Sequence, residues 1–158
     1  MPALYIDGDS CHVLEYAETI AEREQIECHI FCDTSRILNP SYGELHIVDR
    51  GRDSADFAIL KRVEKGDIVV TNDSGLSSMV LAKKGIPINS RGFVITERNV
   101  MSFLNSRHIR AKEKHKTGKG QVKGLFTDEK HENKKPNFSS TLVYLIRKQK
   151  EEELESNS

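Results

Sequence analysis

The chain has 158 residues, 37% of them hydrophobic and 30% charged, which fits one globular domain with a well-solvated surface. No apolar run approaches the roughly 20 residues that cross a bilayer, and Met1-Pro-Ala-Leu-Tyr-Ile lacks the basic start of an export signal. We therefore expect a cytoplasmic protein with no membrane partner. The net charge is zero, but residues 105–124 carry seven basic side chains against one acidic, whereas residues 1–104 carry 11 against 16.

The first third of the chain alternates short apolar runs with a helical pattern. Residues 3–7 (ALYID) predict a buried strand, and the apolar spacing that follows predicts a helix from Cys11 to Glu24. Residues 27–32 alternate as in a strand. Residues 33–44 contain Asn-Pro-Ser-Tyr-Gly and predict a loop, and residues 45–49 predict another short strand.

The same alternation continues through the middle of the chain. Asp53 and Ser54 offer an N-cap for a helix that ends at Val63. Residues 67–71 (DIVVT) form the strongest strand pattern, and the helix predicted over 74–84 ends at Gly85 as a C′ glycine. A strand over 86–89 follows, then a helix that Thr96 caps and that runs to residue 104. A last amphipathic helix is predicted over 139–150.

Repeated strand–helix–strand units predict an α/β fold, a three-layer sandwich with a mainly parallel central sheet. We expect one domain over residues 1–150, with a basic, flexible segment at 107–135 and an acidic disordered tail at 151–158. Sites in such sheets lie outside the carboxyl ends of the strands.

Carboxylates follow this edge in three separate segments. Asp7 ends the first strand with Asp9 two residues later, and Asp73 follows the strand over 67–71. Asp53 and Asp56 lie three residues apart at a helix start, on one helix face. Clustered carboxylates repel one another unless a hard cation is present, and Mg²⁺ or Mn²⁺ suits oxygen ligands. Each aspartate taken alone also fits an ordinary turn or helix cap.

Basic residues supply candidate phosphate contacts. Arg91 lies in Asn89-Ser-Arg-Gly after a strand and fits either a phosphate-binding residue or an ordinary surface arginine. The basic segment is poor in aromatic residues, which favours contact with a nucleic-acid backbone over base stacking. A solvated loop is the alternative. The candidate contacts are Arg107, Arg110, Lys112, Lys114 and Lys116.

A zinc site built on Cys28-His29-Ile-Phe-Cys32 is rejected, because structural zinc needs four ligands at characteristic spacing. Cys28 and Cys32 fit core positions of a strand better. Cys11, near the acidic residues and a helix start, fits a somewhat activated thiol, although nothing in the sequence requires one.

Four motifs, in order, resemble the bacterial YaiI/YqxD family over roughly residues 3–105. Asp7-Gly-Asp-Ser-Cys-His-Val resembles the family's Asp-Ala-Asp-Ala-Cys-Pro-Val, and Asn89-Ser-Arg-Gly is similar to its Asn-Pro-Arg-Gly. Ser54-Ala-Asp-Phe-Ala-Ile and Asp67-Ile-Val-Val-Thr-Asn-Asp-Ser-Gly-Leu resemble its acidic helix start and later strand, and Phe126-Thr-Asp-Glu resembles a piece near its end. His12 and Ser90 replace prolines of the family, which changes the two turns but removes no carboxylate.

The resemblance implies a PIN-like fold, the fold of many Mg²⁺- or Mn²⁺-dependent nucleases. It carries the acidic pattern over as Asp7, Asp56 and Asp73, with Asp9 and Asp53 as auxiliary carboxylates. The implied function is hydrolysis of phosphodiester bonds. The implied partner is nucleic acid, single-stranded RNA first, and a homodimer is left open.

Two other functions stay open at this point. Asp7-Gly-Asp9 also resembles the phosphatase motif of the haloacid dehalogenase superfamily, with Asp7 as nucleophile, Thr71 in the second motif and Lys83 or Lys84 as the lysine. The fourth, acidic motif of that superfamily is missing after residues 86–89. The third reading is a non-catalytic module that binds nucleic acid or a nucleotide through the same edge.

Overall fold

Five parallel strands form one sheet at the centre of the molecule, in the order β3-β2-β1-β4-β5. The computed structural model describes residues 1–35, 37–51, 53–105 and 137–156, without the side chains of residues 9–11. The strands are β1 (Leu4–Asp7), β2 (Cys28–Asp33), β3 (Glu44–Val48), β4 (Ile68–Val70) and β5 (Ile86–Ile88). This architecture confirms the predicted α/β class with a parallel sheet.

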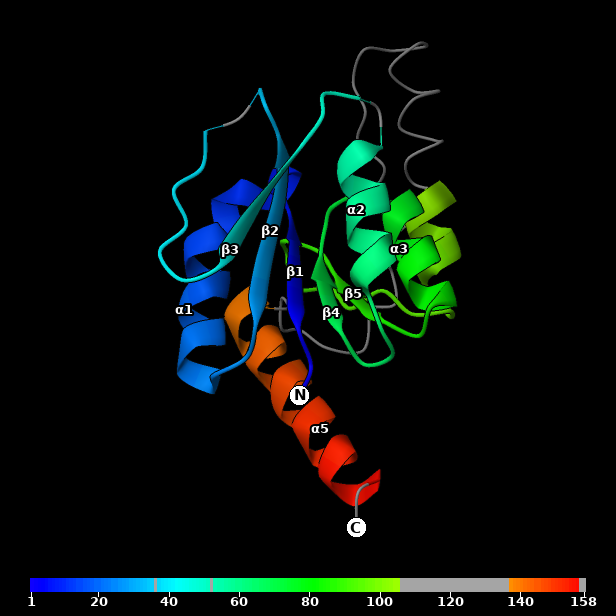
Figure 1. The fold of residues 1–158 in the computed structure, drawn as a ribbon. Helices are drawn as coiled ribbons and strands as arrows, with labels where there is room; N and C mark the ends of the chain where they lie inside the picture. Colours follow the sequence, from blue (N-terminus) through cyan, green and yellow to red (C-terminus); the bar gives the residue numbers. More distant parts are fainter. Residues whose placement is uncertain (36, 52, 106–136, 157–158) are drawn as a thin grey trace.

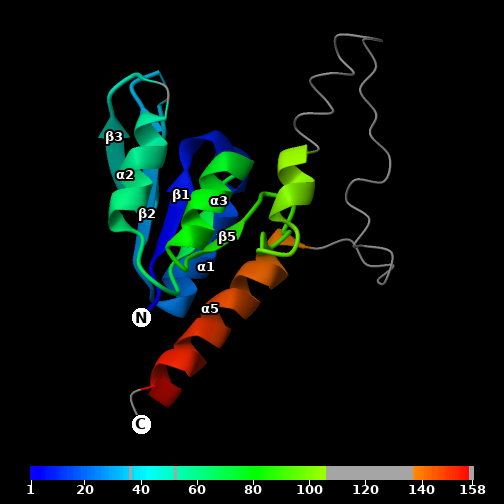
Figure 2. The same cartoon turned by 90° about the vertical axis from the view of Figure 1, so that its right-hand side faces the viewer.

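Helices cover both faces of the sheet, which makes the fold an α/β/α sandwich (Figures 1 and 2). On one face lie α1 (Leu14–Glu24) and α5 (Phe138–Ser156), which pack against each other. On the other lie α2 (Ser54–Arg62) and α3 (Ser74–Ala82). The 3₁₀ helix η1 (Gly8–Val13) joins β1 to α1. No described helix is long and apolar enough to cross a membrane.

Strand alternation divides the core between these two faces. In β1, Leu4 and Ile6 pack toward α1 and α5, whereas Tyr5 packs toward α2 and α3. Successive strand side chains point to opposite faces, so a strand buried on both faces consists almost entirely of apolar residues. All four residues of β1 are buried, and so are all three of β4.

The connection between β2 and β3 is a loop, as predicted, although parallel strands are usually joined by a helix. The loop crosses the α1 side, where the buried Glu18 accepts hydrogen bonds at one carboxylate oxygen. The donors are the backbone N–H groups of Tyr42, at 2.5 Å, and Gly43, at 3.2 Å, and the hydroxyl of Ser41, at 3.0 Å. A single buried carboxylate therefore fixes the loop that delivers the edge strand β3.

Two helix ends differ from the prediction. The helix expected from Cys11 begins as η1 and becomes α-helical only at Leu14. At the end of α3, the left-handed residue is Lys84, with φ of 63°, and Gly85 is not the C′ glycine. Gly85 instead allows close packing, because a Cβ there would lie 2.8 Å from Val80 Cγ1.

The predicted disordered tail at 151–158 is wrong for residues 151–156, which continue α5 to Ser156. Glutamate is a good helix former. Ion pairs also anchor this helix, because Arg147 and Lys150 both pair with Glu24 of α1, at 3.1 and 3.7 Å. The N-terminal ammonium contacts Glu153 at 2.5 Å.

Candidate functional site

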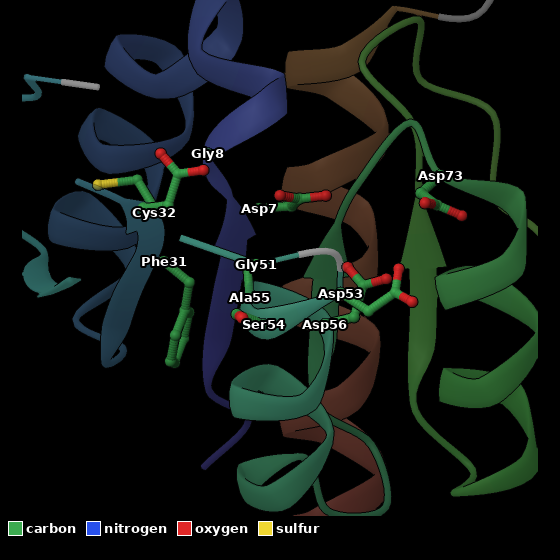
Figure 3. A pocket seen from close by; sticks show the side chains of 11 residues that line it. Asp7, Gly8, Phe31, Cys32, Gly51, Asp53, Ser54, Ala55, Asp56 and Asp73 are labelled. Atoms are coloured by element: carbon green, nitrogen blue, oxygen red, sulfur yellow. The ribbon is translucent and has the colours of Figure 1, made fainter. Parts of the chain in front are cut away.

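A cleft of about 130 Å³ opens at the carboxyl end of the sheet (Figure 3). Its walls come from the ends of β1 and β2, the start of α2 and the residue that caps α3. Five aspartates line it: Asp7, Asp33, Asp53, Asp56 and Asp73. We call this feature the acidic cleft. The structure thus brings together four of the five carboxylates that the sequence singled out, and adds one.

Asp7 is the most deeply buried of the sequence-predicted carboxylates whose side chains the structure describes. Its side chain is only 3% exposed, and its Oδ2 accepts a hydrogen bond of 2.9 Å from the hydroxyl of Thr71. The chain leaves Asp7 through Gly8, where a Cβ would lie 2.7 Å from the carbonyl oxygen of Phe31. Glycine permits this close approach to β2, and a Cβ at this position would require the neighbouring strand to shift.

Asp73 is held in place by its role as the N-cap of α3. Its Oδ1 accepts hydrogen bonds from the backbone N–H groups of Gly75, at 2.8 Å, and Leu76, at 3.1 Å. Its own N–H donates to Thr71 Oγ1 at 3.0 Å. Since Thr71 donates in turn to Asp7, one threonine hydroxyl links two of the predicted carboxylates.

The start of α2 supplies the next two carboxylates. Asp53 occupies the N-cap position, but its side chain makes no capping hydrogen bond, contrary to the predicted cap. Its φ of 69° lies in the left-handed region, which is uncommon for a non-glycine residue although aspartate tolerates it. Asp56 follows in the first turn of α2, and both side chains line the cleft (Figure 3).

Asp33 is a cleft residue that the sequence reasoning missed. It ends β2, the strand beside β1, so the strand-end rule that selected Asp7 also applies to it. It was assigned instead to the following loop. Its Oδ1 accepts a hydrogen bond of 2.8 Å from the N–H of Ser35 and another from the Ser35 hydroxyl, which is ordinary turn chemistry.

The donor chemistry of the cleft fits a hard divalent cation. None of the described residues that line it is a lysine, arginine or histidine, and all five ionisable carboxylates carry the same sign. Carboxylate oxygens are the ligands that Mg²⁺ and Mn²⁺ take. The carboxylates are spread out, however: among the described side chains, no three of them bring oxygens within 4.8 Å of one another.

The predicted phosphate contacts are not part of the described cleft. Arg91 is exposed in a turn where Asn89 Oδ1 accepts from the N–H groups of Arg91 and Phe93, both at 3.0 Å. This turn lies near the cleft, because Ser90 donates to Asn72 Oδ1, beside Asp73. Arg107, Arg110, Lys112, Lys114 and Lys116 lie outside the described residues, and so does the side chain of Asp9.

The lysines required by the phosphatase alternative lie at the wrong end of α3. Asp73 caps the first turn of this helix, whereas Lys83 and Lys84 follow its last residue, roughly 13 Å away along the axis. Lys83 donates instead to the carbonyl oxygen of Leu60. The geometry therefore removes the lysine from the predicted haloacid-dehalogenase-like constellation.

The cysteines of β2 are buried, as expected. Burial, with a smaller contribution from Glu18, raises the pKa of the Cys28 thiol to about 12. A thiol that stays protonated is a poor metal ligand. Elsewhere among the described residues, one group of side chains has the types and spacing of metal ligands. It consists of His29 on β2 and of Glu44 and His46 on β3.

Comparison with known proteins places the chain in a family. The model of the "Uncharacterized BCR, YaiI/YqxD family" matches residues 5–148. The chain belongs to the YaiI/YqxD family. It is 35% identical over 121 residues to a UPF0178 protein of Clostridium acetobutylicum, which covers 77% of this chain and 82% of that protein. No solved structure matches the chain.

Other YaiI/YqxD relatives match over longer or more similar stretches. A UPF0178 protein of Lachnoclostridium phytofermentans is 33% identical over 144 residues, 91% of this chain and 96% of that protein. One of Clostridium kluyveri is 40% identical over 116 residues, 73% of this chain and 76% of that protein. The family assignment suggested by the sequence motifs is therefore confirmed.

Proposed function

We propose that this YaiI/YqxD protein is a Mg²⁺- or Mn²⁺-dependent hydrolase of phosphodiester bonds, with single-stranded RNA as its substrate. The observation that carries the proposal is the acidic cleft. Five aspartates from four chain segments surround one small cavity at the sheet edge where parallel α/β folds bind ligands. The proposal also rests on the PIN-like fold that the resemblance to the YaiI/YqxD family implies, which is fold-level analogy.

Asp7, Asp56 and Asp73 would hold the ion or ions, with Asp9, Asp33 and Asp53 as auxiliary carboxylates. A bound Mg²⁺ or Mn²⁺ would supply Lewis-acid stabilisation of charge at phosphorus and lower the pKa of water nearby.

The chain's own residues orient these ligands. The Thr71 hydroxyl fixes one oxygen of Asp7 and accepts the N–H of Asp73, so the β1 and β4 sides of the cleft keep a constant spacing. The N-cap bonds of Asp73 hold that side chain at the start of α3. These bonds would fix the directions from which Asp7 and Asp73 approach an ion.

The substrate assignment rests on charge. An acidic cleft repels a polyanion unless cations accompany it, and residues 105–124 provide seven basic side chains against one acidic. In the proposal, Arg107, Arg110, Lys112, Lys114 and Lys116 bind the phosphate backbone. Arg91, exposed in the turn tethered to Asn72, adds a cation near the cleft.

Calorimetric titration of metal-free protein with Mn²⁺, followed by cleavage of end-labelled single-stranded RNA and DNA, tests the proposal. Asp7→Asn and Asp73→Asn should lose ion binding and lower the cleavage rate at least about 100-fold, a typical loss for one transition-state contact. Asp49→Asn is the matched control, because Asp49 is exposed and does not line the cleft. Equal Mn²⁺ affinity in all four proteins would overturn the metal site.

A non-catalytic module that binds nucleic acid is the second candidate. It is favoured by the local roles of Asp73, which caps α3, and Asp33, which fixes a turn. These bonds account for two of the five carboxylates without any ion. Tight RNA binding with no turnover in the presence of Mg²⁺ or Mn²⁺ would support the module over the nuclease.

A further inference from the structure

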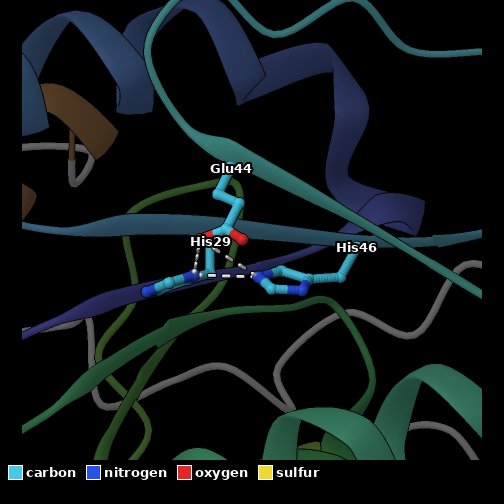
Figure 4. A group of neighbouring side chains, drawn as sticks. All are labelled: His29, Glu44 and His46. Atoms are coloured by element: carbon cyan, nitrogen blue, oxygen red, sulfur yellow. Dashed lines mark hydrogen bonds and ion pairs between the residues drawn. The ribbon is translucent and has the colours of Figure 1, made fainter.

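A second cluster of ligand-type side chains lies on the face of the sheet, away from the acidic cleft. His29 on β2 and Glu44 and His46 on β3 form this group, which we call the histidine cluster (Figure 4). His29 pairs in register with Glu44, and His46 is two residues farther along the edge strand. Alternation therefore places all three side chains on one face of two neighbouring strands.

We propose that the histidine cluster binds a divalent transition-metal ion of the Zn²⁺ type. His29 Nδ1 and His46 Nε2 lie 2.9 Å apart, and Glu44 Oε2 lies 3.6 Å from the first and 3.9 Å from the second. Tetrahedral zinc with metal–nitrogen distances near 2.05 Å needs ligand atoms roughly 3.3 Å apart. The three measured separations bracket this value, so small side-chain shifts suffice.

Neighbouring groups orient both rings for this role. The other nitrogen of His29, Nε2, lies 3.4 Å from Glu27 Oε2, the carboxylate–histidine contact that fixes a ligand's tautomer in metal sites. The His29 ring stacks on Tyr5 with centroids 5.4 Å apart, and the His46 ring stacks on Phe31 at 4.7 Å. Packed rings lose little freedom when they bind a metal.

The charge balance of the site admits a cation. Glu27 and Glu44 supply two carboxylates, against one guanidinium, Arg62, whose carbon lies 6.0 Å from the Phe31 ring centre. Burial, with help from Arg62 and His29, lowers the pKa of His46 against the opposing effect of Glu44. A lower pKa favours the neutral imidazole, the form that binds metals.

Nitrogen donors separate this site from the acidic cleft in chemistry as well as position. Imidazole suits Zn²⁺, whereas all-carboxylate sites suit Mg²⁺ or Mn²⁺. His29 precedes the cleft residue Asp33 by four positions, about 13 Å along the strand, while Phe31, on which the His46 ring stacks, borders both sites. Glu44 is 68% exposed, so the third ligand faces solvent and an ion can enter and leave. A bound ion would fasten the edge strand β3 to β2.

The competing explanation is a hydrogen bond between the two imidazoles, with no ion involved. Zn²⁺ or Co²⁺ titration of tag-free, chelator-treated protein decides between them. We expect one ion per chain, a Co²⁺ absorption spectrum typical of tetrahedral coordination, and metal-bound His29 Nδ1 and His46 Nε2 in long-range ¹⁵N NMR spectra. A melting temperature that rises with Zn²⁺ should accompany binding.

Zn²⁺ binding by single-residue variants identifies which side chains of the histidine cluster hold the ion. His46→Gln and His29→Gln should weaken Zn²⁺ binding at least about 100-fold, and Glu27→Gln roughly tenfold as an outer partner. Glu44→Gln is the variant safest for folding, because this side chain is exposed. His12→Gln and Glu22→Gln, at exposed positions away from the cluster, are the matched controls and should bind as the unmodified protein does.

Two results would overturn the proposal. One is failure of the unmodified protein to bind Zn²⁺ under these conditions, which would leave the imidazole hydrogen bond as the whole explanation. The other is binding that His29→Gln and Glu44→Gln leave intact, which would place the ion on other side chains. Mn²⁺ titration of the same variants keeps the result separate from the acidic cleft, since that site should be unaffected.

Discussion

The acidic cleft and the histidine cluster lie on one sheet, yet their donor groups are positioned in different ways. The cleft collects carboxylates where strands end and helices begin, and helix-cap and turn hydrogen bonds hold Asp73 and Asp33 there. The histidine cluster collects side chains from the start of β2 and the first half of β3, and ring stacking holds the two imidazoles. The gathering of carboxylates at the cleft depends on strand direction, whereas the gathering of the histidine cluster depends on the register between two strands.

The acidic cleft and the histidine cluster also differ in charge. Five like charges around the cleft require a cation for close approach, whereas the two imidazoles already lie within hydrogen-bonding distance. Removing a carboxylate from the cleft should therefore relieve repulsion in the metal-free protein. Removing an imidazole should break a contact that exists without metal.

The largest effect that we predict concerns the reactivity of Cys28, whose buried thiol belongs to neither site. Its pKa of about 12, against an ordinary value of 9.0, lowers the thiolate fraction about 1,000-fold near neutral pH. Alkylation by iodoacetamide, followed at Cys28 by mass spectrometry, should slow by at least this factor relative to protein unfolded in urea. A native rate within tenfold of the unfolded rate would contradict it, and would reopen thiol ligation by zinc.

Asp7→Asn should have the next largest effect, with opposite signs in two conditions. In Mn²⁺ the variant should bind the ion about 100-fold more weakly, because the most buried ligand loses its charge. In chelator it should be more stable by about 1 kcal/mol, since one like charge is removed and the amide oxygen can still accept from Thr71. Thermal unfolding in each condition measures both. Asp49→Asn should change neither.

Glu18→Ala should affect the two sites differently, because Glu18 holds the loop that precedes β3. The substitution leaves the donors of Ser41, Tyr42 and Gly43 without their shared acceptor and should destabilise the protein by about 1–3 kcal/mol. Because this loop delivers β3, Zn²⁺ affinity should fall while Mn²⁺ affinity at the cleft is kept. Glu18→Gln, which retains an acceptor, should lose less. Parallel losses for both ions would mean that the two sites are coupled.

The smallest effect is the pH dependence that His46 contributes. Its pKa is lower in the folded protein than the ordinary 6.5, so the unfolded chain binds the proton more readily. The stability from this residue is fully present above pH 6.5 and is lost as the pH falls below that value. Urea unfolding from pH 7.5 to 5, in chelator, should show a shallower slope for His46→Gln. An unchanged slope would show that other groups dominate.

Much of this molecule follows from local pattern. The sequence patterns predict all five strands: β1 and β4 are apolar because they are buried on both faces, whereas alternation marks β2. The strand-end rule leads to Asp7 and Asp73, and the helix start to Asp53 and Asp56, which the structure places around one cleft. The strand-end rule applies equally to Asp33, which ends β2. The turn residues over 33–44 predict a loop from Asp33 onward, so the sequence pattern places the strand end one residue too early.

Other features depended on contacts that no local pattern contains. The left-handed residue after α3 is Lys84, because Gly85 is needed beneath Val80. The acidic run after residue 150 is helical to Ser156, in a helix that Glu24 of α1 anchors through Arg147 and Lys150. In both cases packing or charge from a distant segment decided the local conformation.

The sequence by itself determined the parallel sheet, its carboxyl edge and most of the carboxylates there, because period-two burial and chain direction are properties of each segment alone. The tertiary structure decided which side chains share a face. His29 and His46 are 17 residues apart, and only the pairing of β2 with β3 brings their nitrogens to 2.9 Å. Strand register is set by the packing of both sheet faces together, and a shift of one residue would turn these side chains to opposite sides.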